Sequence, residues 1–341
     1  MALTIVCALA FLCLHAAVLA GPLKRRMPRL RGAILSVLLV ADSLLAGVLA
    51  MEVYFRAVHD QSDGFALTWA GKAWMARHWK PVNSLGYRDA EVTPPAPGQR
   101  SVAFLGDSFV AGHGVERPED RFTDVAARAL GPGWKVYNLA RNGWDSVDEA
   151  KGLRAFPVAP EAVVLVYYLN DIFNAAAKAD YPLTFSVNLP RGFTKTLTEN
   201  SALFDFVYWR FARGGNLAGG ASTFWDSLKG AYADPKVWGA HAAELADLAQ
   251  AVRERGAKPL AVVFPMLQAV DASAPLTAKV AEQLTALGFE TVDLAPVLRG
   301  RPVPGLVVNA LDAHPSLALH REVGEMLAAK LKAVQEGHGD R

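Results

Sequence analysis

Apolar residues are distributed unevenly along this chain of 341 residues. The first sixty residues hold two long apolar runs, whereas from residue 101 onward short apolar runs alternate with longer stretches of helical spacing. Short, largely β-branched runs are typical of strands buried on both faces. The alternation of strands and helices predicts an α/β fold, a three-layer sandwich around a parallel sheet.

We expect five strands and five main helices in this region. The strands are predicted at 101–106, 135–139, 162–168, 259–264 and 290–294, and the helices at 121–130, 146–155, 240–255, 275–287 and 317–335. One segment, 172–238, is too long for a simple crossover and contains five aromatic residues between positions 204 and 211. Such an insertion forms either a lid or partner surface at the functional edge, or extra helices over one flank.

The two N-terminal apolar runs predict a transmembrane helical hairpin. Residues 2–20 carry no formal charge and are long enough to cross about 30 Å of hydrocarbon, and a second span runs over 32–55. The loop 21–31 contains five basic residues, which the positive-inside rule keeps in the cytoplasm. The alternative is a cleaved signal peptide ending near Ala20, but the first residues lack a basic side chain and cleavage would export the basic loop.

This topology predicts a multi-pass protein of the inner (cytoplasmic) membrane whose main domain faces the periplasm. The expected domains are the hairpin at 1–56, a juxtamembrane segment and Pro-rich linker at 57–100, and a catalytic domain at 101–341. In the juxtamembrane segment, Trp69, Trp74 and Trp79 either lie on the lipid headgroups or belong to a helix packed on the domain. The expected partners are the lipid bilayer and a membrane protein.

Composition excludes several kinds of function. The 35 basic and 33 acidic residues nearly balance, which gives no argument for nucleic-acid binding. The two cysteines, Cys7 and Cys13, both lie in the first apolar run, so no disulfide or thiolate metal site is expected elsewhere. The sequence contains neither HExxH nor GxxxxGK[ST], and no metal or other cofactor is expected.

Candidate chemistry begins at Gly106-Asp107-Ser108, directly after the first predicted strand. A turn at the carboxyl edge of a parallel sheet is where open α/β folds place their active sites. A serine becomes a nucleophile when a base takes its proton and a third group orients that base. Asp312 and His314, in a predicted loop before the last helix, supply the orienting acid and the base. Asp107 and His113 are interpreted as turn and loop residues.

Acyl transfer also requires donors for the oxyanion that forms on the carbonyl oxygen, each worth about 10²–10³ in rate. Three candidates follow successive predicted strands. They are the backbone N–H of Ser108, the backbone N–H of Gly143 and the side-chain amide of Asn170. Because the carboxyl ends of parallel strands meet at one edge of the sheet, we expect these groups to lie close together.

Ser108, Gly143, Asn170 and His314 resemble the four marker residues of the SGNH (GDSL-type) hydrolase superfamily, in that family's order. The resemblance covers about residues 101–332 and implies a flavodoxin-like sandwich and a Ser-His-Asp mechanism on esters. One residue separates Asp312 from His314, whereas many members have two. The segment 83–89 also resembles a stretch that precedes the core in some membrane-associated members.

For members with a membrane anchor, the resemblance implies O-acyl chemistry on cell-surface glycans. We therefore expect a membrane-anchored serine esterase or O-acyltransferase that acts on acyl groups, above all acetyl, of an extracytoplasmic glycan. Two alternatives remain open from the sequence. One is a lipase or thioesterase acting on lipid esters, and the other is a non-catalytic module that binds a glycan or a partner protein.

Overall fold

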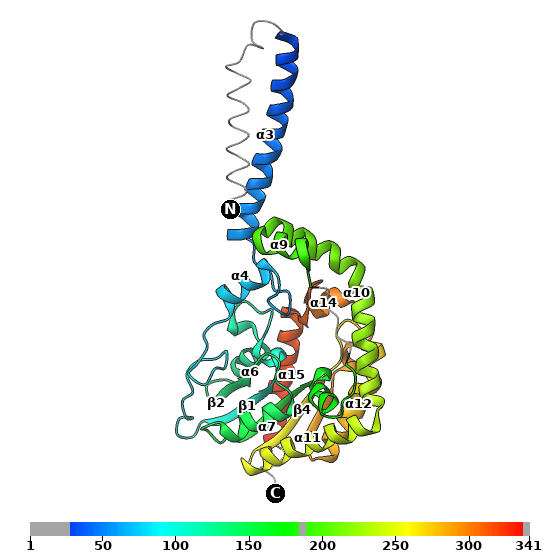
Figure 1. The fold of residues 1–341 in the computed structure, drawn as a ribbon. Helices are drawn as coiled ribbons and strands as arrows, with labels where there is room; N and C mark the ends of the chain where they lie inside the picture. Colours follow the sequence, from blue (N-terminus) through cyan, green and yellow to red (C-terminus); the bar gives the residue numbers. More distant parts are fainter. Residues whose placement is uncertain (1–27, 184–188, 337–341) are drawn as a thin grey trace. The chain divides into compact units, whose positions relative to one another are not determined.

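The structure is a computed structural model that describes residues 28–183 and 189–336. The chain divides into two compact units (Figure 1). The first contains the N-terminal residues up to Asp60, with Thr68–Ala70 and Asn188–Gly214. The second contains Gln61–Leu67, Gly71–Val187 and Gly215–Arg341, and so includes much of the segment that precedes the first predicted strand.

The second unit is built on a five-stranded parallel sheet in the order β2-β1-β3-β4-β5. This is the flavodoxin-like order, in which successive strands are added on one side of β1 and then on the other, so the strand order reverses between β1 and β3. The predicted fold class is confirmed, and each strand end lies within one residue of its predicted position. The strands are β1 (Arg100–Gly106), β2 (Trp134–Ala140), β3 (Ala162–Tyr168), β4 (Lys258–Phe264) and β5 (Glu290–Asp293).

Alternate residues of the strands feed two apolar clusters, one on each face of the sheet. Ala103 and Leu105 of β1 belong to the first cluster, and Val102 and Phe104 to the second. The first face is covered by α7 (Ser146–Ala155), α8 (Phe173–Lys178), α11 (Pro235–Glu254) and much of α12 (Val270–Ala286). The second is covered by α5 (Ser108–Ala111), α6 (Phe122–Leu130), α13 (Ala295–Leu298), α14 (Val303–Leu306) and α15 (Leu317–Glu336) (Figure 1).

Two of the predicted helices begin earlier than expected. The first is α11, which starts at Pro235 because the Asp234 carboxylate accepts hydrogen bonds from the next free backbone N–H groups and proline suits the first position. The second is α12, which starts at Val270, so Pro275 lies inside the helix and does not mark its start. The periodicity identified both helices, but a capping contact fixed the start of α11, and α12 begins without a side-chain cap.

The described part of the long insertion is mostly helical. It contains α8, α9 (Gly192–Asn200) and α10 (Ala202–Ala233). The C-terminal end of α10 buries Leu228, Ala231 and Tyr232 in the first apolar cluster. This part of the insertion therefore consists of extra helix covering one flank of the sheet, which was the second of the two interpretations of the segment.

The first unit contains the apolar helix α3 (Pro28–Ala57). Within the described residues, Gly32–Ala57 is the one helical stretch long and apolar enough to cross a membrane, as an anchor or a signal sequence would be. Its end is tied to the insertion, because the Glu52 carboxylate accepts hydrogen bonds from Ser201 and from the backbone of Ala202 and Leu203. The predicted first span, 2–20, lies outside the described residues.

The juxtamembrane segment contains a helix that the pattern did not resolve, α4 (Trp69–His78). In the second unit, Trp74 of this helix is only 2% exposed and stacks on His113 at 5.4 Å between ring centroids. Trp74 therefore belongs to the core of the domain and does not contact lipid headgroups, which corrects one of the two readings of the tryptophan-rich stretch.

Candidate active site

Ser108 lies at the sharp turn between β1 and the short helix α5. Asp107 caps this helix, since its carboxylate accepts a hydrogen bond of 2.8 Å from the backbone N–H of Phe109. The turn needs glycine at position 106, because a Cβ there would lie 2.5 Å from the Val110 side chain and 2.9 Å from the Val166 carbonyl oxygen. The turn therefore presses against β3 and leaves Ser108 partly exposed at the carboxyl edge of the sheet.

Asp312 and His314 do not lie in a loop, as predicted, but on a strand. β6 (Val307–Asn309) and β7 (Asp312–Pro315) form a small antiparallel hairpin. Residues two apart on a strand project from the same face. The single-residue spacing, with Ala313 between them, therefore brings the carboxylate and the imidazole to one side of the hairpin.

The structure brings the three sequence-predicted residues into one chain of hydrogen bonds. Nε2 of His314 lies 2.8 Å from Oγ of Ser108, and Nδ1 lies 2.5 Å from Oδ1 of Asp312. The backbone N–H of His314 donates to the same Asp312 oxygen at 3.0 Å. This is the arrangement that an activated serine requires: hydroxyl to imidazole, and imidazole to a fixed carboxylate.

Burial and charge shift the pKa values of His314 and Asp312 in opposite directions. Burial alone would lower the pKa of His314, but the charge of Asp312 and the hydrogen bond to it outweigh burial and raise the pKa above its ordinary value. Burial would likewise raise the pKa of Asp312, but the His314 charge and hydrogen bond, with smaller contributions from His113 and Ser62, hold it well below the usual range. Asp312 therefore stays ionised and makes His314 the stronger base.

The three oxyanion candidates occupy the same edge of the sheet. Gly106 pairs with Ala140 of β2 and with Val166 of β3, so Ser108, Gly143 and Asn170 follow the sheet at corresponding levels. Gly143 has φ +77°, a backbone conformation that favours glycine, and lies in an exposed turn. Asn170, in the 3₁₀ turn η2 (Leu169–Ile172), makes a side-chain hydrogen bond to Asp107. Their service as oxyanion donors remains a prediction.

Two further carboxyl groups lie buried behind this edge, Glu149 on α7 and Asp171 on η2. Both are at most 1% exposed, and among the described residues neither Glu149 oxygen has a hydrogen-bond partner. Asp171 has one weak contact, 3.5 Å from Oγ of Ser146. Burial raises the pKa of both groups well above the ordinary values, reinforced by repulsion from Asp107 at Glu149 and from Glu149 and Asp107 at Asp171. Glu149 and Asp171 are therefore neutral acids, whereas Asp312 is charged.

His113, expected to be a loop residue, lies against the predicted base. Its ring stacks on His314 with 4.6 Å between centroids and 21° between planes, and its Nδ1 lies 3.0 Å from the Asn142 amide nitrogen. Burial, then the charge of His314, lowers the pKa of His113 to about 4, so the ring is neutral near pH 7. The uncharged His113 ring therefore packs against the His314 ring without adding a second positive charge.

His113, Asp312 and His314 are close enough to suggest a metal site, with their ligand atoms within 4.8 Å of one another. The two imidazole planes are nearly parallel, so their in-plane lone pairs do not converge on one point. Both nitrogens of His314 already contact Ser108 and Asp312. The geometry fits a hydrogen-bonded group better than a coordination site.

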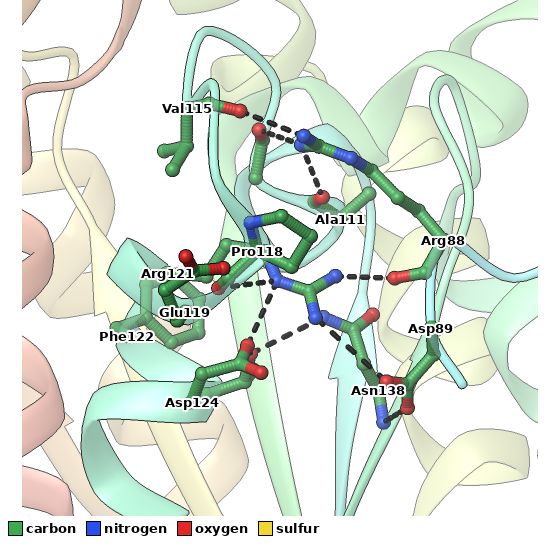
Figure 2. Close-up of polar contacts among 12 residues, drawn as sticks. Arg88, Asp89, Ala111, Val115, Pro118, Glu119, Arg121, Phe122, Asp124 and Asn138 are labelled. Atoms are coloured by element: carbon green, nitrogen blue, oxygen red, sulfur yellow. Dashed lines mark hydrogen bonds and ion pairs between the residues drawn. The ribbon is translucent and has the colours of Figure 1, made fainter. Parts of the chain in front are cut away.

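The loop that carries His113 is held in place by a buried arginine (Figure 2). The Arg88 guanidinium donates to the carbonyl oxygens of Gly112 at 2.6 Å and Val115 at 2.7 Å, and more weakly to Ala111. Burial, then the charge of Arg121, lowers the pKa of Arg88 to about 10, so it remains charged at neutral pH. Carbonyl dipoles at the end of α5 and the following loop thus compensate this charge.

Arg121 and Asp89 connect the same segment to the sheet (Figure 2). Arg121 donates to the backbone carbonyl of Arg88 and to Asp124 at 2.8 Å. The Asp89 carboxylate accepts a hydrogen bond of 3.0 Å from the backbone N–H of Asn138 in β2. The segment 83–89, whose role the sequence did not reveal, therefore fixes the position of the loop beside Ser108.

A sequence model of the GDSL-like lipase/acylhydrolase family matches residues 104–322 of this chain. The match spans more than half of the chain and contains every sequence-predicted site residue. It begins after Ser62, Trp74 and Arg88, the N-terminal residues that contact the site. No curated protein matches the chain.

Several solved structures are similar in fold at low sequence identity. A lipase/acylhydrolase from Enterococcus faecalis is 13% identical with a TM-score of 0.42, covering 69% of this chain and 97% of its own. A carbohydrate acetylesterase family member from Sinorhizobium meliloti is 17% identical with a TM-score of 0.39, covering 69% and 98%. An inhibitor-bound aryl esterase from M. smegmatis is 16% identical with a TM-score of 0.35, covering 69% and 99%.

Proposed function

The chain belongs to the GDSL-like lipase/acylhydrolase family and is a hydrolase of that family; we propose that it uses Ser108 to cleave or transfer ester-linked acyl groups. The observation that carries the proposal is the continuous hydrogen-bond chain from Asp312 through His314 to Ser108. A serine in such a chain is the nucleophile of acyl-transfer enzymes on several unrelated folds.

In the first half-reaction, Oγ of Ser108 attacks the ester carbonyl carbon while Nε2 of His314 takes the hydroxyl proton. Asp312 stabilises the imidazolium that forms, because its carboxylate is ionised and already bonded to Nδ1. The negative charge that develops on the carbonyl oxygen is met by the N–H groups of Ser108 and Gly143 and by the Asn170 amide. Return of the proton from His314 to the leaving alkoxide releases the alcohol and leaves an acyl-serine.

In the second half-reaction, an acceptor hydroxyl attacks the acyl-serine carbonyl and gives its proton to His314. When the acceptor is water, the product is a carboxylic acid and the enzyme is an esterase. When the acceptor is a sugar hydroxyl, the product is a new ester and the enzyme is an O-acyltransferase. Both reactions regenerate the Ser108 hydroxyl by the same proton transfer from His314.

For the substrate we propose acyl groups, above all acetyl, carried by an extracytoplasmic glycan. Support comes from the candidate span in α3 and from the basic residues that precede it, which favour retention of that loop in the cytoplasm. On this proposal residues 1–56 form the membrane hairpin, and the domain after it faces the periplasm at the inner membrane. The bilayer, the acylated glycan and a membrane protein are then its expected partners.

The test is turnover of a series of nitrophenyl esters, from acetate to palmitate, by the full chain in detergent, with Ser108→Ala beside it. We expect acetate to be cleaved best and Ser108→Ala to lose at least about 10³-fold in kcat. Ser101→Ala is the matched control, because Ser101 is a buried serine of β1 whose hydroxyl accepts from the backbone of Glu161.

Each other outcome has a defined meaning. Preference for palmitate would replace the glycan proposal with a lipase or thioesterase. Turnover that survives in Ser108→Ala would refute the serine mechanism, and a folded wild type that cleaves none of the esters would favour a binding module. Adding an O-deacetylated glycan to the acetate reaction distinguishes transfer, seen as acetylated glycan, from hydrolysis.

A further inference from the structure

The carboxylate of Asp312 accepts a third hydrogen bond, from a residue outside the family-matched region. One carboxylate oxygen, Oδ1, accepts from the backbone and from Nδ1 of His314. The other, Oδ2, accepts a hydrogen bond from the hydroxyl of Ser62. Ser62 is 3% exposed and Asp312 is fully buried, so water does not replace this contact.

The chain around Ser62 is fixed tightly against the hairpin. The side-chain amide of Asn309, at the end of β6, donates to the Ser62 carbonyl oxygen at 3.0 Å. Gly64 follows with φ +79°, and a Cβ at that position would lie 3.3 Å from the Asp312 carboxylate. Asp63 is buried, and a Cβ on Gly71 would meet its carboxylate at 2.4 Å. The backbone thus leaves the Ser62 hydroxyl little freedom to turn away.

We propose that Ser62 is a positioning residue of the active site, which fixes the orientation of the Asp312 carboxylate and through it the imidazole of His314. This inference rests on the proposed serine mechanism. A carboxylate bonded on one oxygen only can rotate about its own axis, whereas donors on both oxygens hold its plane. The Ser62 hydroxyl supplies the bond that the family-matched residues do not.

The proposal gives the juxtamembrane segment a role in catalysis. Only four residues, Val58 to Gln61, separate the last residue of α3 from Ser62. The segment 57–100 was expected to be a juxtamembrane segment and Pro-rich linker, yet it delivers a side chain to the acid of the proposed triad. Residues 61–67 are thus part of the catalytic unit, in keeping with their place in the second compact unit.

Removing the hydroxyl leaves a buried carboxylate oxygen without a donor, so Ser62→Ala makes Asp312 more basic. A more basic carboxylate favours the protonated imidazole, and the pKa of His314 rises. The other charged or titratable groups around this pair among the described residues are Asp107 from the β1–α5 turn, His113 from the loop after α5, Asp63 beside His113, and His320 on α15. Ser62→Ala changes none of them.

The experiment compares wild type, Ser62→Ala and Ser62→Thr as full chains in detergent, with Ser101→Ala as the matched loss of a buried serine. For Ser62→Ala we expect about a tenfold fall in kcat with KM unchanged, because a charge-assisted hydrogen bond is lost from the catalytic groups and not from substrate binding. The acidic limb of the kcat profile moves to higher pH. Ser62→Thr keeps a hydroxyl and restores the wild-type limb, and Ser101→Ala leaves it in place.

A second readout is independent of turnover. In chains carrying ¹⁵N-labelled histidine, the ring nitrogens of His314 are titrated by NMR, and Ser62→Ala is expected to raise the midpoint above that of wild type and of Ser101→Ala. An unshifted midpoint with unchanged kcat would overturn the role of Ser62. Absence of turnover in the wild type would refute the proposed function, while the titration would still decide whether Ser62 acts on the pair. If Ser62→Ala does not fold, Ser62→Cys, a weak donor of similar size, replaces it.

Discussion

Asp312 and Glu149 are both completely buried acidic side chains of one domain, yet the structure gives them opposite charge states. Asp312 accepts hydrogen bonds from Ser62 and from two nitrogens of His314, and the charge of His314 together with these donors holds its pKa well below the usual range. Glu149 has no hydrogen-bond partner among the described residues, and burial raises its pKa well above the ordinary value. Donors, not depth, decide whether a buried carboxyl keeps its charge.

The two groups also change the free energy of unfolding in opposite directions as the pH changes. The folded-state pKa of Asp312 is lowered, so its contribution is present above the unfolded pKa and is lost as pH falls through the folded value. The folded-state pKa of Glu149 is raised, so its contribution is present below the unfolded pKa and is lost as pH rises through the folded value. One carboxyl therefore serves chemistry at neutral pH, and the other weakens the fold there.

The largest expected effect comes from removing the charge of Asp312 while keeping its shape. Asp312→Asn leaves His314 without an anionic partner and favours the wrong tautomer, so kcat should fall by about 10⁴-fold. Asp234→Asn, which keeps a cap on α11 away from the site, is the control and should retain full activity. Steady-state kinetics with an acetyl ester measure both, and a loss of less than tenfold in Asp312→Asn would show that the acid is misassigned.

The second prediction concerns Glu149, the carboxyl group that stays neutral in the folded protein. Glu149→Gln removes a group that resists ionisation, so the free energy of unfolding at pH 8 should rise by several kcal/mol, with ester turnover retained. Urea denaturation at pH 8 measures the change. The control is Glu244→Gln, because Glu244 is paired with Lys178 at 3.0 Å and His241 at 3.2 Å and its pKa is lowered. This control should lose stability.

The pH dependence of unfolding sharpens that test. In the wild type, ionisation of Glu149 lowers the free energy of unfolding by about 1.4 kcal/mol per pH unit for each proton released. Glu149→Gln should flatten this decline as pH rises above about 4.5, the ordinary value for a glutamate. Parallel curves for wild type and variant would mean that the glutamate is not neutral in the folded protein.

The smallest expected effect is on the pH profile of the wild type. Because Asp312 raises the pKa of His314, the acidic limb of kcat/KM should have its midpoint above about 6.5, the ordinary value for histidine. Stopped assays between pH 5 and 9 would locate it. A midpoint below 6 would indicate that burial outweighs the carboxylate and would contradict the charge state assigned to Asp312.

Much of the fold was predictable because the apolar runs that indicate strands in the sequence are also the segments that form the sheet. The strands β1, β3 and β4 are apolar runs that are almost wholly buried, and their ends follow from where those runs stop. The edge strands β2 and β5 are only partly buried. Ser108, Asp312 and His314 were also predictable, since each lies beside a strand end or helix start. The prediction of a loop at 312–314 was wrong because a hairpin of three- and four-residue strands leaves no periodic signal.

Other features depend on contacts that no local pattern encodes. Ser62 is separated from Asp312 by 250 positions, and one serine in a polar stretch gives no sign of that bond. Glu149 lies on α7, where its charge predicts a solvent-facing position, and Asp171 follows Asn170 as an ordinary helix cap would. Their burial is set by the packing of α7 and η2 against the sheet.

Covalent labelling is the direct test of whether His314 and Asp312 activate Ser108. The full chain is treated with a fluorophosphonate and digested, and the modified peptide is located by mass spectrometry in wild type, His314→Ala and Ser101→Ala. We predict a single adduct on Ser108 in wild type and in Ser101→Ala, and almost none in His314→Ala. An adduct on another residue, or labelling of Ser108 that does not depend on His314, would contradict the claim.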